Sequence, residues 1–585
     1  MNFAERLKLF REQTGRSQYE LASLLGVSKI TILRWENSTS KPSPLAAEKL
    51  MQLGFGQIDS SETKIASVPR LSLIQGEDLR DGLRAKLKIG SIEYVFNPAP
   101  YVINGPADQI PFFEILYDLQ SIDELPCPIN EYASKLSSIA ELPLLTLETS
   151  QYLLEKPKPT AKHWNPNYGP HGWHRYVGRF PPHLIRAVIN NFSLVRHATL
   201  YDPFAGSGTA LVEGRLLGLR SIGVEISPLS AMISRTKCLF PTNTQPLEKI
   251  IEDLGSYYHS KWNEFLGNRE PSRITHRAIL GRAGNPIREF PNIEKWMISE
   301  ALLGTSIVVE FAQTLEGYQR DFVCCALSSR MRSIGNVDVD VVRAEYSSRP
   351  RHDVDVLKLV ISSLRRVIND INNTLASHPY ISSPEDIQII QSSLLETDLE
   401  DNSVDCIITS PPYGVESLSY LRTHLLSYRC LGSILGIDPY EKNEKVIGSE
   451  YLSNKEIDVS NLIVEQMSKT FQSFFAGSVI ADQSTQYRNR RNMMMHFFEQ
   501  MVHVANHFHK VLRNHGKVAF VIGNKKLGNF QIPTDKIIID IFASAGLVHE
   551  KSIPQKLKCN NSNSEVPWQE RTIQDEYILL FSNHK

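Results

Sequence analysis

Residues 199–209 (TLYDPFAGSGT) place two glycines between an apolar strand and a helix, and this junction constrains the fold more than any other segment. Glycine lets the backbone turn sharply and approach a ligand closely, as the first strand-to-helix turn of a nucleotide-binding α/β fold requires. The next predicted strand, residues 221–225, ends in Glu225, whose carboxylate can accept hydrogen bonds from two ribose hydroxyls. Together the two signals predict a parallel sheet that binds a nucleoside-containing ligand.

Two common kinds of nucleotide-binding site are excluded by the sequence. Leu211 stands where the third glycine of the dinucleotide motif G-x-G-x-x-G belongs. The sequence also lacks the G-x-x-x-x-G-K-[ST] loop that cradles nucleoside triphosphates. The ligand is therefore expected to be a different nucleoside.

Residues 404–414 (VDCIITSPPYG) form an apolar strand that ends at two prolines and an aromatic residue. Proline has no amide hydrogen, so the turn is stiff and its carbonyl groups are available to accept hydrogen bonds. The amino group of a base is a poor nucleophile because its lone pair is delocalised into the ring. Ser410 and the Pro411 carbonyl can accept its two hydrogens, while Tyr413 stacks on a base that has left the duplex. The structural alternative is an ordinary proline-rich surface turn.

The motifs DPFAGSGT (residues 202–209) and TSPPYG (residues 409–414) resemble the cofactor and catalytic motifs of amino-methylating DNA methyltransferases. The serine before the two prolines is most similar to the N4-cytosine group, because the N6-adenine group usually carries Asp or Asn there. The resemblance covers roughly residues 180–585, insertions excluded. It implies a Rossmann-like α/β methyltransferase domain, S-adenosylmethionine as cofactor and double-stranded DNA as partner.

The resemblance also implies residue roles. The catalytic residues would be Ser410, Pro411, Pro412 and Tyr413, and the cofactor would be held by Asp202, Phe204, Gly206, Ser207, Gly208, Thr209 and Glu225. One position departs from the family, which usually has an acid that contacts the cofactor adenine before the loop at residues 401–405. This chain has Gln-Ser-Ser at residues 391–393, so we expect that contact from Ser392, or else from Asp398.

The pattern along the chain predicts several units. Strand patterns occur at residues 199–204, 221–225, 405–409, 517–522 and 577–581, within a methyltransferase domain expected at residues 163–585. Residues 240–385 have a mainly helical pattern and are expected to be an insertion, a candidate target-recognition region. Residues 56–160 mix strand-like pieces, such as 92–96 and 112–117, with a lysine- and proline-rich linker at 155–162, and their role stays open.

Residues 1–55 show helical spacing throughout and predict an all-α helix-turn-helix domain. A short helix from Ser17, a turn at Gly26 and a second helix capped by Ser28 are similar to phage-repressor-like domains. Such domains place the second helix in the major groove. The side chains expected to contact DNA are Ser28, Lys29, Thr31 and Arg34.

The composition restricts the remaining possibilities. The 63 basic and 64 acidic side chains nearly balance, so a DNA-binding surface must come from local clusters. Candidate clusters are Arg330, Arg332, Arg343, Arg349 and Arg351, and then Arg488, Arg490, Arg491, Lys525 and Lys526. The cysteine and histidine spacing matches no metal site, and no apolar run is long enough for a membrane. We expect a cytoplasmic protein without a metal, and a cognate restriction endonuclease is a possible partner.

Two other functions remain open at this stage. RNA guanine-N2 methyltransferases share a similar cofactor loop and an N-P-P-Y-G turn, although Ser410 replaces that asparagine. The chain is alternatively a transcriptional repressor whose methyltransferase-like domain senses S-adenosylmethionine. An intact S-P-P-Y turn and a DNA-type first domain favour the DNA methyltransferase.

Overall fold

The computed structural model describes parts of residues 1–50, short strands at 72–73, 85–89 and 92–96, and most of residues 167–585. The gaps in the last range are 177, 193, 195–196, 268–269, 271–272, 339–343, 348–350, 378–380, 414–419, 437–445, 449–461, 476–484, 528–529 and 557–574. The chain forms two compact units, Met1–Pro69 and Arg70–Lys585. The expected strand at 112–117 and the linker at 155–162 lie outside the described residues.

The first unit contains the predicted helix pair, α2 (Gln18–Leu25) and α3 (Lys29–Glu36). Leu21 and Leu25 of α2 pack with Ile32 and Trp35 of α3 in one buried cluster. The Glu36 carboxylate accepts hydrogen bonds from Arg11 Nε at 2.5 Å and Gln18 Nε2 at 2.7 Å, which ties the end of α3 to the preceding elements. The second helix is thereby fixed, with Arg34 exposed.

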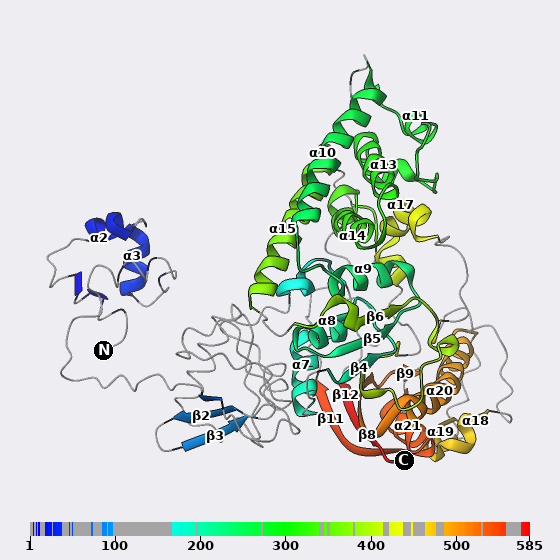
Figure 1. The fold of residues 1–585 in the computed structure, drawn as a ribbon. Coiled ribbons are helices and arrows are strands. Elements are labelled where there is room, and N and C mark those ends of the chain that lie inside the picture. Colours follow the sequence, from blue (N-terminus) through cyan, green and yellow to red (C-terminus); the bar gives the residue numbers. More distant parts are fainter. Residues whose placement is uncertain are drawn as a thin grey trace. The chain divides into compact units, whose positions relative to one another are not determined.

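The second unit is built on a seven-stranded sheet with the order β11-β12-β8-β7-β4-β5-β6 (Figure 1). Its strands are β4 (Thr199–Asp202), β5 (Arg220–Val224), β6 (Ile387–Ile390), β7 (Val404–Thr409), β8 (Leu512–Gly523), β11 (Leu547–Lys556) and β12 (Asp575–Asn583). Strands β6, β5, β4, β7 and β8 are parallel, and β12 runs antiparallel to both β8 and β11. The five predicted strands are confirmed to within a few residues, whereas β6 and β11 were not predicted.

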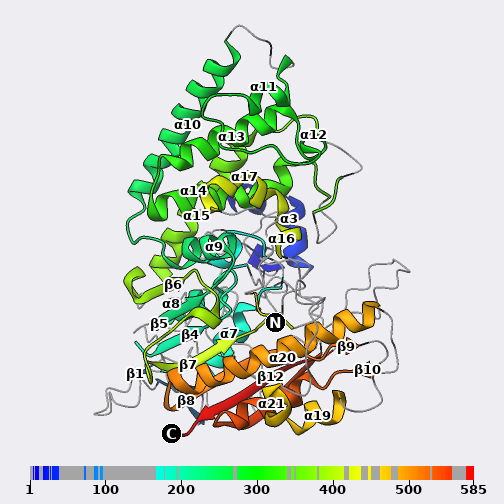
Figure 2. The same cartoon turned by 90° about the vertical axis from the view of Figure 1, so that its right-hand side faces the viewer.

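Side chains alternate between the two faces of the sheet along each strand, so both faces present apolar residues. Helices cover both of these faces. In β7, Cys406 and Ile408 pack with α7 (Pro182–Asn191) and α8 (Thr209–Leu216). The neighbouring Ile407 faces the opposite cluster, which contains α20 (Thr485–Val511) and α21 (Thr534–Ser544). Figure 2 shows α20 running along the sheet on that side. The smaller helices of this layer are α18 (Ile463–Met467) and α19 (Lys469–Phe475).

The segment between α9 (Pro228–Cys238) and β6 is mainly helical in its described residues. It contains α10 (Gln245–Leu266), α11 (His276–Leu280), α12 (Ile293–Trp296), α13 (Ser299–Gln313), α14 (Gly317–Ile334) and α15 (Val356–Ser377). One apolar core joins these helices to α9 and to α17 (Leu425–Leu435), which follows the short α16 (Tyr420–Thr423). The insertion is thus packed against α9, the helix that follows β5.

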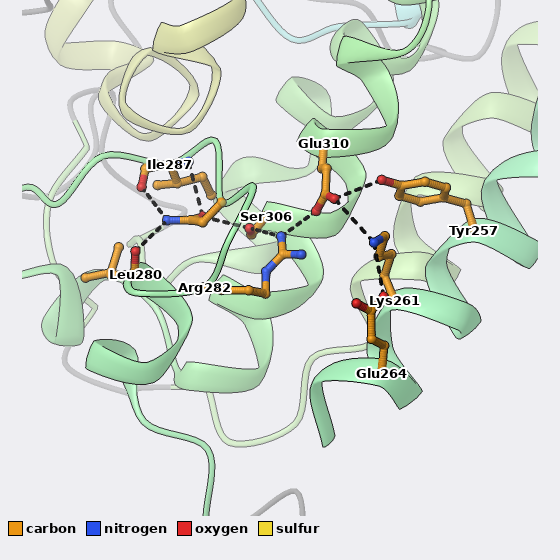
Figure 3. Close-up of polar contacts among 9 residues, drawn as sticks. Tyr257, Lys261, Glu264, Leu280, Arg282, Ile287, Ser306 and Glu310 are labelled. Carbon is orange, nitrogen blue, oxygen red and sulfur yellow. Dashed lines mark hydrogen bonds and ion pairs between the residues drawn. The ribbon is translucent and has the colours of Figure 1, made fainter. Parts of the chain in front are cut away.

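A polar network also fastens the insertion together (Figure 3). Glu310 of α13 pairs with Arg282 at 2.5 Å and accepts a hydrogen bond from the Tyr257 hydroxyl of α10 at 2.9 Å. Arg282 also donates to Ser306 Oγ at 3.0 Å. These contacts fix the loop after α11 against α10 and α13.

The remaining elements are short. A three-stranded antiparallel sheet consists of β1 (Ser72–Leu73), β2 (Ala85–Ile89) and β3 (Ile92–Phe96), so the expected strand at 92–96 is confirmed. A two-stranded ribbon joins β9 (Lys526–Leu527) to β10 (Phe530–Gln531). The 3₁₀ turns are η5 (Gly169–Gly172), η7 (Pro384–Asp386) and η8 (Leu394–Glu396).

Candidate active site

The carboxyl ends of the parallel strands bring the predicted site residues to one edge of the sheet. The chain runs from β4 outward through β5 to β6 and then returns to β7 on the other side of β4. Ligands of open α/β sheets bind where the strand order reverses in this way. Asp202 ends β4, Glu225 follows β5 and Ser410 follows β7, so the three lie around this reversal point.

The turn after β4 has the geometry that its glycines allow. Gly206 and Gly208 have φ angles of +53° and +80°, in the left-handed region that side chains disfavour. The Glu225 carboxylate accepts hydrogen bonds from the Gly206 amide at 2.8 Å and the Ser227 amide at 2.7 Å. Two backbone donors therefore orient the carboxylate that was predicted to hold a ribose.

Asp202 connects the two turns of the site. Its Oδ1 atom accepts a hydrogen bond from Thr409 Oγ1 at 2.6 Å and another from the Phe204 amide at 3.1 Å. Thr409 is the last residue of β7, immediately before Ser410. Burial raises the pKa of Asp202 to about 7, and it raises the pKa of Glu225 to about 7 as well. Both carboxyls are thus held in a shielded site where hydrogen-bond donors of a ligand stabilise their charged form.

The other predicted cofactor residues surround the same turn. Ser207 Oγ is buried and has no hydrogen-bond partner among the described residues, so a polar group of a ligand can satisfy it. Phe204 is half-buried against the core under β7, and Thr209 begins α8. These residues fit a nucleoside cofactor.

Ser392 and Asp398 differ in their placement. Ser392 lies two residues after β6, whose Ile390 carbonyl accepts the Glu225 amide at 3.0 Å, so it shares the edge with Glu225. Asp398 is exposed and pairs with Lys510 at 3.0 Å, just before β8 begins. That position is at the amino end of the parallel strands, opposite to the site. Ser392 rather than Asp398 is therefore the candidate for the adenine contact.

The turn after β7 forms a chain of hydroxyl groups. Ser410 Oγ donates to the Tyr413 hydroxyl at 3.1 Å, and that hydroxyl donates to the Glu576 carboxylate. Pro411 is buried, Pro412 is half-buried, and the Tyr413 ring packs against the core under β7. The structure thus brings the four predicted catalytic residues together beside Asp202.

Sequence reasoning missed Glu576. This residue lies in β12 opposite Gly523 at the carboxyl end of β8. Because β12 is antiparallel, its beginning rather than its end reaches the site edge. The sequence alone did not indicate that β12 runs antiparallel to β8, so it did not place Glu576 at the site.

The loop before α7 was also missed. The Tyr176 hydroxyl hydrogen-bonds Ser230 Oγ at 2.8 Å, and its ring stacks on His424 with centroids 5.5 Å apart. A Cβ at Gly206 would lie 3.7 Å from the Tyr176 ring, so this loop covers the cofactor turn. The same loop lines a pocket of about 660 Å³, whose lining residues are Asn167, Tyr168, Gly169, Gly172, His174, Arg175, Tyr176, Arg179, Arg366 and Asp370.

The predicted DNA-contact residues of the first unit fall on or before α3. Thr31 is half-buried and Arg34 is exposed, while only the backbone of Lys29 is described. Ser28 lies outside the described residues.

The seven-stranded sheet, its glycine turn and the acid after the next strand define a Rossmann-like methyltransferase. A helix-turn-helix family model matches residues 7–53, and a DNA methylase family model matches residues 128–234, which include the cofactor turn. The chain is therefore a DNA amino-methyltransferase with an N-terminal helix-turn-helix domain. The matching DNA methylase family implies S-adenosylmethionine as methyl donor.

Curated relatives support the same class. The type II methyltransferase M.MvaI of Kocuria varians is 24% identical over 71% of this chain and 91% of its own length. M.BsoBI of Geobacillus stearothermophilus is 23% identical over 69% of this chain and 83% of its own length. M.AvaI of Nostoc is 23% identical over 67% of this chain and 82% of its own length.

No group of three or more histidine, cysteine, aspartate or glutamate side chains is placed to hold a metal ion in the described part of the chain. Among the helices of that same part, none has both the length and the apolar character of a membrane span.

Proposed function

We propose that this protein transfers a methyl group from S-adenosylmethionine to the exocyclic amino group of a flipped DNA base, cytosine N4 in particular. The observation that carries the proposal is the hydrogen bond from Thr409 to Asp202, which holds the catalytic turn against the cofactor turn. Ser410 favours cytosine, because the resembling N6-adenine enzymes usually have Asp or Asn at that place.

One group of residues would bind the cofactor, and another would position the amino group of the base. Glu225, Ser207 and Ser392 would hold the cofactor, which when bound supplies an electrophilic methyl group. Ser410 Oγ and the Pro411 carbonyl would accept the two amino hydrogens and so direct the nitrogen lone pair out of the ring plane. The turn is fixed before substrate arrives, and such preorganisation lowers the barrier through orientation.

The names of the relatives suggest a biological setting. Each is a type II methyltransferase, so we propose a role in DNA modification beside a cognate restriction endonuclease. The helix-turn-helix unit would add a DNA contact through Ser28, Lys29, Thr31 and Arg34. The helical insertion at residues 240–385 is the proposed target-recognition region.

Product analysis tests the reaction. The purified protein is incubated with isotope-labelled S-adenosylmethionine and unmethylated genomic DNA, which is then digested to nucleosides for mass spectrometry. We expect labelled N4-methylcytosine. N6-methyladenine would correct the base, whereas transfer to RNA alone would favour a guanine-N2 methyltransferase and contradict the proposal.

An arginine cluster beside the cofactor turn is the proposed grip on DNA phosphates. Arg175 and Arg366 line the 660 Å³ pocket, whose one acidic lining residue is Asp370. Arg330 and Arg332 of α14, which the sequence indicated, join them. Burial lowers the pKa of Arg330 and of Arg332, and the positive charges of Arg366 and Arg175, respectively, lower it further. A phosphodiester would relieve this repulsion.

The other predicted basic residues are placed differently. Arg351 donates to the Gly335 carbonyl at 3.3 Å and therefore holds the end of α14. Arg343 and Arg349 lie outside the described residues, as does the side chain of Lys526. Arg488 is exposed, and Arg490, Arg491 and Lys525 are half-buried. Arg175 and Arg366 are the better candidates because both are exposed and line the pocket, and Arg366 also donates to the Gly172 carbonyl at 2.8 Å.

Replacing Arg175 or Arg366 by alanine is expected to weaken DNA binding and to reduce its salt dependence. Each lost phosphate contact should make the slope of log affinity against log salt shallower by about 0.9. Fluorescence anisotropy with a labelled duplex at several salt concentrations measures this slope. Arg220→Ala is the matched control, because Arg220 is exposed at the amino end of β5, away from the site. An unchanged slope in both pocket variants would contradict the assignment.

A further inference from the structure

The Ser410–Tyr413–Glu576 chain joins residues from two separate elements at the site edge. Ser410 and Tyr413 belong to the turn after β7, whereas Glu576 belongs to β12, more than 160 residues further along the sequence. The Ser410–Tyr413 distance is 3.1 Å, and the tyrosine hydroxyl donates directly to a Glu576 Oε1 atom. The resemblance to known methyltransferases assigned no role to Glu576.

The direction of the hydrogen bonds follows from the chemistry of the last group. An ionised carboxylate can only accept, whereas a hydroxyl has one hydrogen to donate and two lone pairs that accept. The Tyr413 hydrogen is directed to Glu576, so the Tyr413 oxygen accepts from Ser410. The single hydrogen of Ser410 is then directed away from the substrate. Its lone pairs are left to face an amino group.

We propose that Glu576 is a positioning residue that fixes Ser410 as a hydrogen-bond acceptor and receives the proton released from the base. This inference rests on the proposed function and deepens it. If Glu576 were neutral, Tyr413 could donate to Ser410 instead, and the serine could then donate to the nitrogen lone pair. That orientation would oppose attack on the methyl group.

The proton transfer balances along this chain. As the amino nitrogen gains the methyl group, it loses one hydrogen as a proton to Ser410 Oγ. The hydrogen that Ser410 carried moves to the Tyr413 oxygen, and the hydrogen of Tyr413 moves to Glu576. The two hydroxyl groups end as they began, and Glu576 ends as a carboxylic acid that water deprotonates after release of the product.

The surroundings of Glu576 favour this role. Gly523 of β8 and Gln555 of β11 lie opposite it in the two flanking strands, and neither carries a charge. Burial raises the pKa of Glu576, while the Tyr413 hydroxyl acts in the other direction. A carboxylate with a raised pKa accepts a proton more readily than one at the surface.

A double-mutant cycle distinguishes a chain from independent contacts. Glu576→Gln keeps the shape of the side chain, and Tyr413→Phe keeps the ring. Each is expected to slow single-turnover methyl transfer by about tenfold to hundredfold, the effect of losing a hydrogen bond to a charged group. The double variant should be no slower than the slower single variant, because residues that act as a unit are not additive.

Binding measurements and a control complete the kinetic test. Affinities for S-adenosylmethionine and for DNA should stay unchanged in the variants. Glu550→Gln should keep the wild-type rate, since Glu550 of neighbouring β11 pairs with Lys517 at 2.6 Å away from the site. Rates that multiply in the double variant, or a rate unaffected by Glu576→Gln, would overturn the inference.

A readout without catalysis separates this inference from the proposed function. A fluorotyrosine placed at position 413 gives a ¹⁹F resonance that should shift with pH as Glu576 ionises, with a midpoint above the ordinary carboxyl range. The shift should be absent in Glu576→Gln and retained in Glu550→Gln. Asp202 also titrates in this site, and the comparison of variants separates its effect. A wild-type protein that methylates no DNA would reject the proposed function, whereas a resonance insensitive to Glu576 would reject the chain.

Discussion

Replacing Ser410 by alanine is expected to reduce the rate of methyl transfer to DNA by about a hundredfold to a thousandfold, the range measured when one preorganised polar group is removed from a catalytic site. The reason is that alanine leaves one amino hydrogen without an acceptor, while the nitrogen must lose its conjugation with the ring. Single-turnover assays with labelled S-adenosylmethionine measure the effect. The affinity for S-adenosylmethionine should be unchanged, because Glu225 and Asp202 accept their hydrogen bonds from Gly206, Ser227 and Thr409 rather than from Ser410.

Ser403→Ala is the matched control for this prediction. Ser403 precedes the same strand β7, and its hydroxyl donates to the Glu400 carbonyl at 2.7 Å at the opposite edge of the sheet. Its loss should leave the rate of methyl transfer close to that of wild type, since this hydroxyl contacts only the Glu400 carbonyl at the far end of β7. A Ser410→Ala protein that retained the wild-type rate would mean that the turn acts through its backbone alone. A biological effect that survived it would favour a repressor.

The sequence was sufficient for the part of the fold where local chemistry and tertiary structure agree. The glycines at 206 and 208 have the positive φ angles that the turn requires, and the apolar run before Ser410 is the buried strand β7. Buried parallel strands read as continuous apolar runs, so they are visible without knowledge of their neighbours. The cofactor and catalytic turns follow from these two strands.

The unpredicted strands lack that local signal. β6 has four residues and follows a long helical insertion, so its pattern is short and isolated. β11 contains Pro554 and several charged residues, a composition that is tolerated because it is an edge strand. Glu576 was missed for a related reason, since its role depends on the antiparallel pairing of β12 with β8. Such pairings arise between distant segments and leave no periodic trace.

A buried glutamate on α8 provides the prediction with the largest effect on stability. Glu213 is fully buried and pairs with Arg186 Nε of α7 at 2.6 Å. It also contacts His171 Nε2 at 2.7 Å and accepts a hydrogen bond from the Tyr168 hydroxyl. The three partners belong to the loop and helix that precede the cofactor strand. This carboxylate therefore fixes the covering loop, with Tyr176, onto the helix that begins at the cofactor turn.

Replacing Glu213 by alanine is expected to lower the free energy of unfolding by about 3–5 kcal/mol, because the Arg186 charge stays buried without its partner. Denaturant unfolding followed by circular dichroism measures the change. Glu264→Ala is the control, since it breaks only the exposed pair with Lys261 and should cost about 1 kcal/mol or less. Equal effects in the two variants would show that the buried network contributes no more than a surface ion pair.

The pH dependence of the stability difference between wild type and Glu213→Ala tests whether the Glu213 charge causes that difference. Burial alone would raise the pKa of Glu213, but the Arg186 charge and the hydrogen bonds from His171 and Tyr168 hold it at about 2. The folded carboxyl thus stays ionised at pH values where the unfolded one, near 4.5, takes up a proton. Its stabilising contribution is complete above 4.5 and is lost as the pH falls from 4.5 toward 2. The difference in stability between wild type and Glu213→Ala should therefore be equal at pH 7.5 and pH 5.5 and smaller at pH 4, whereas a gap independent of pH would assign the effect to packing.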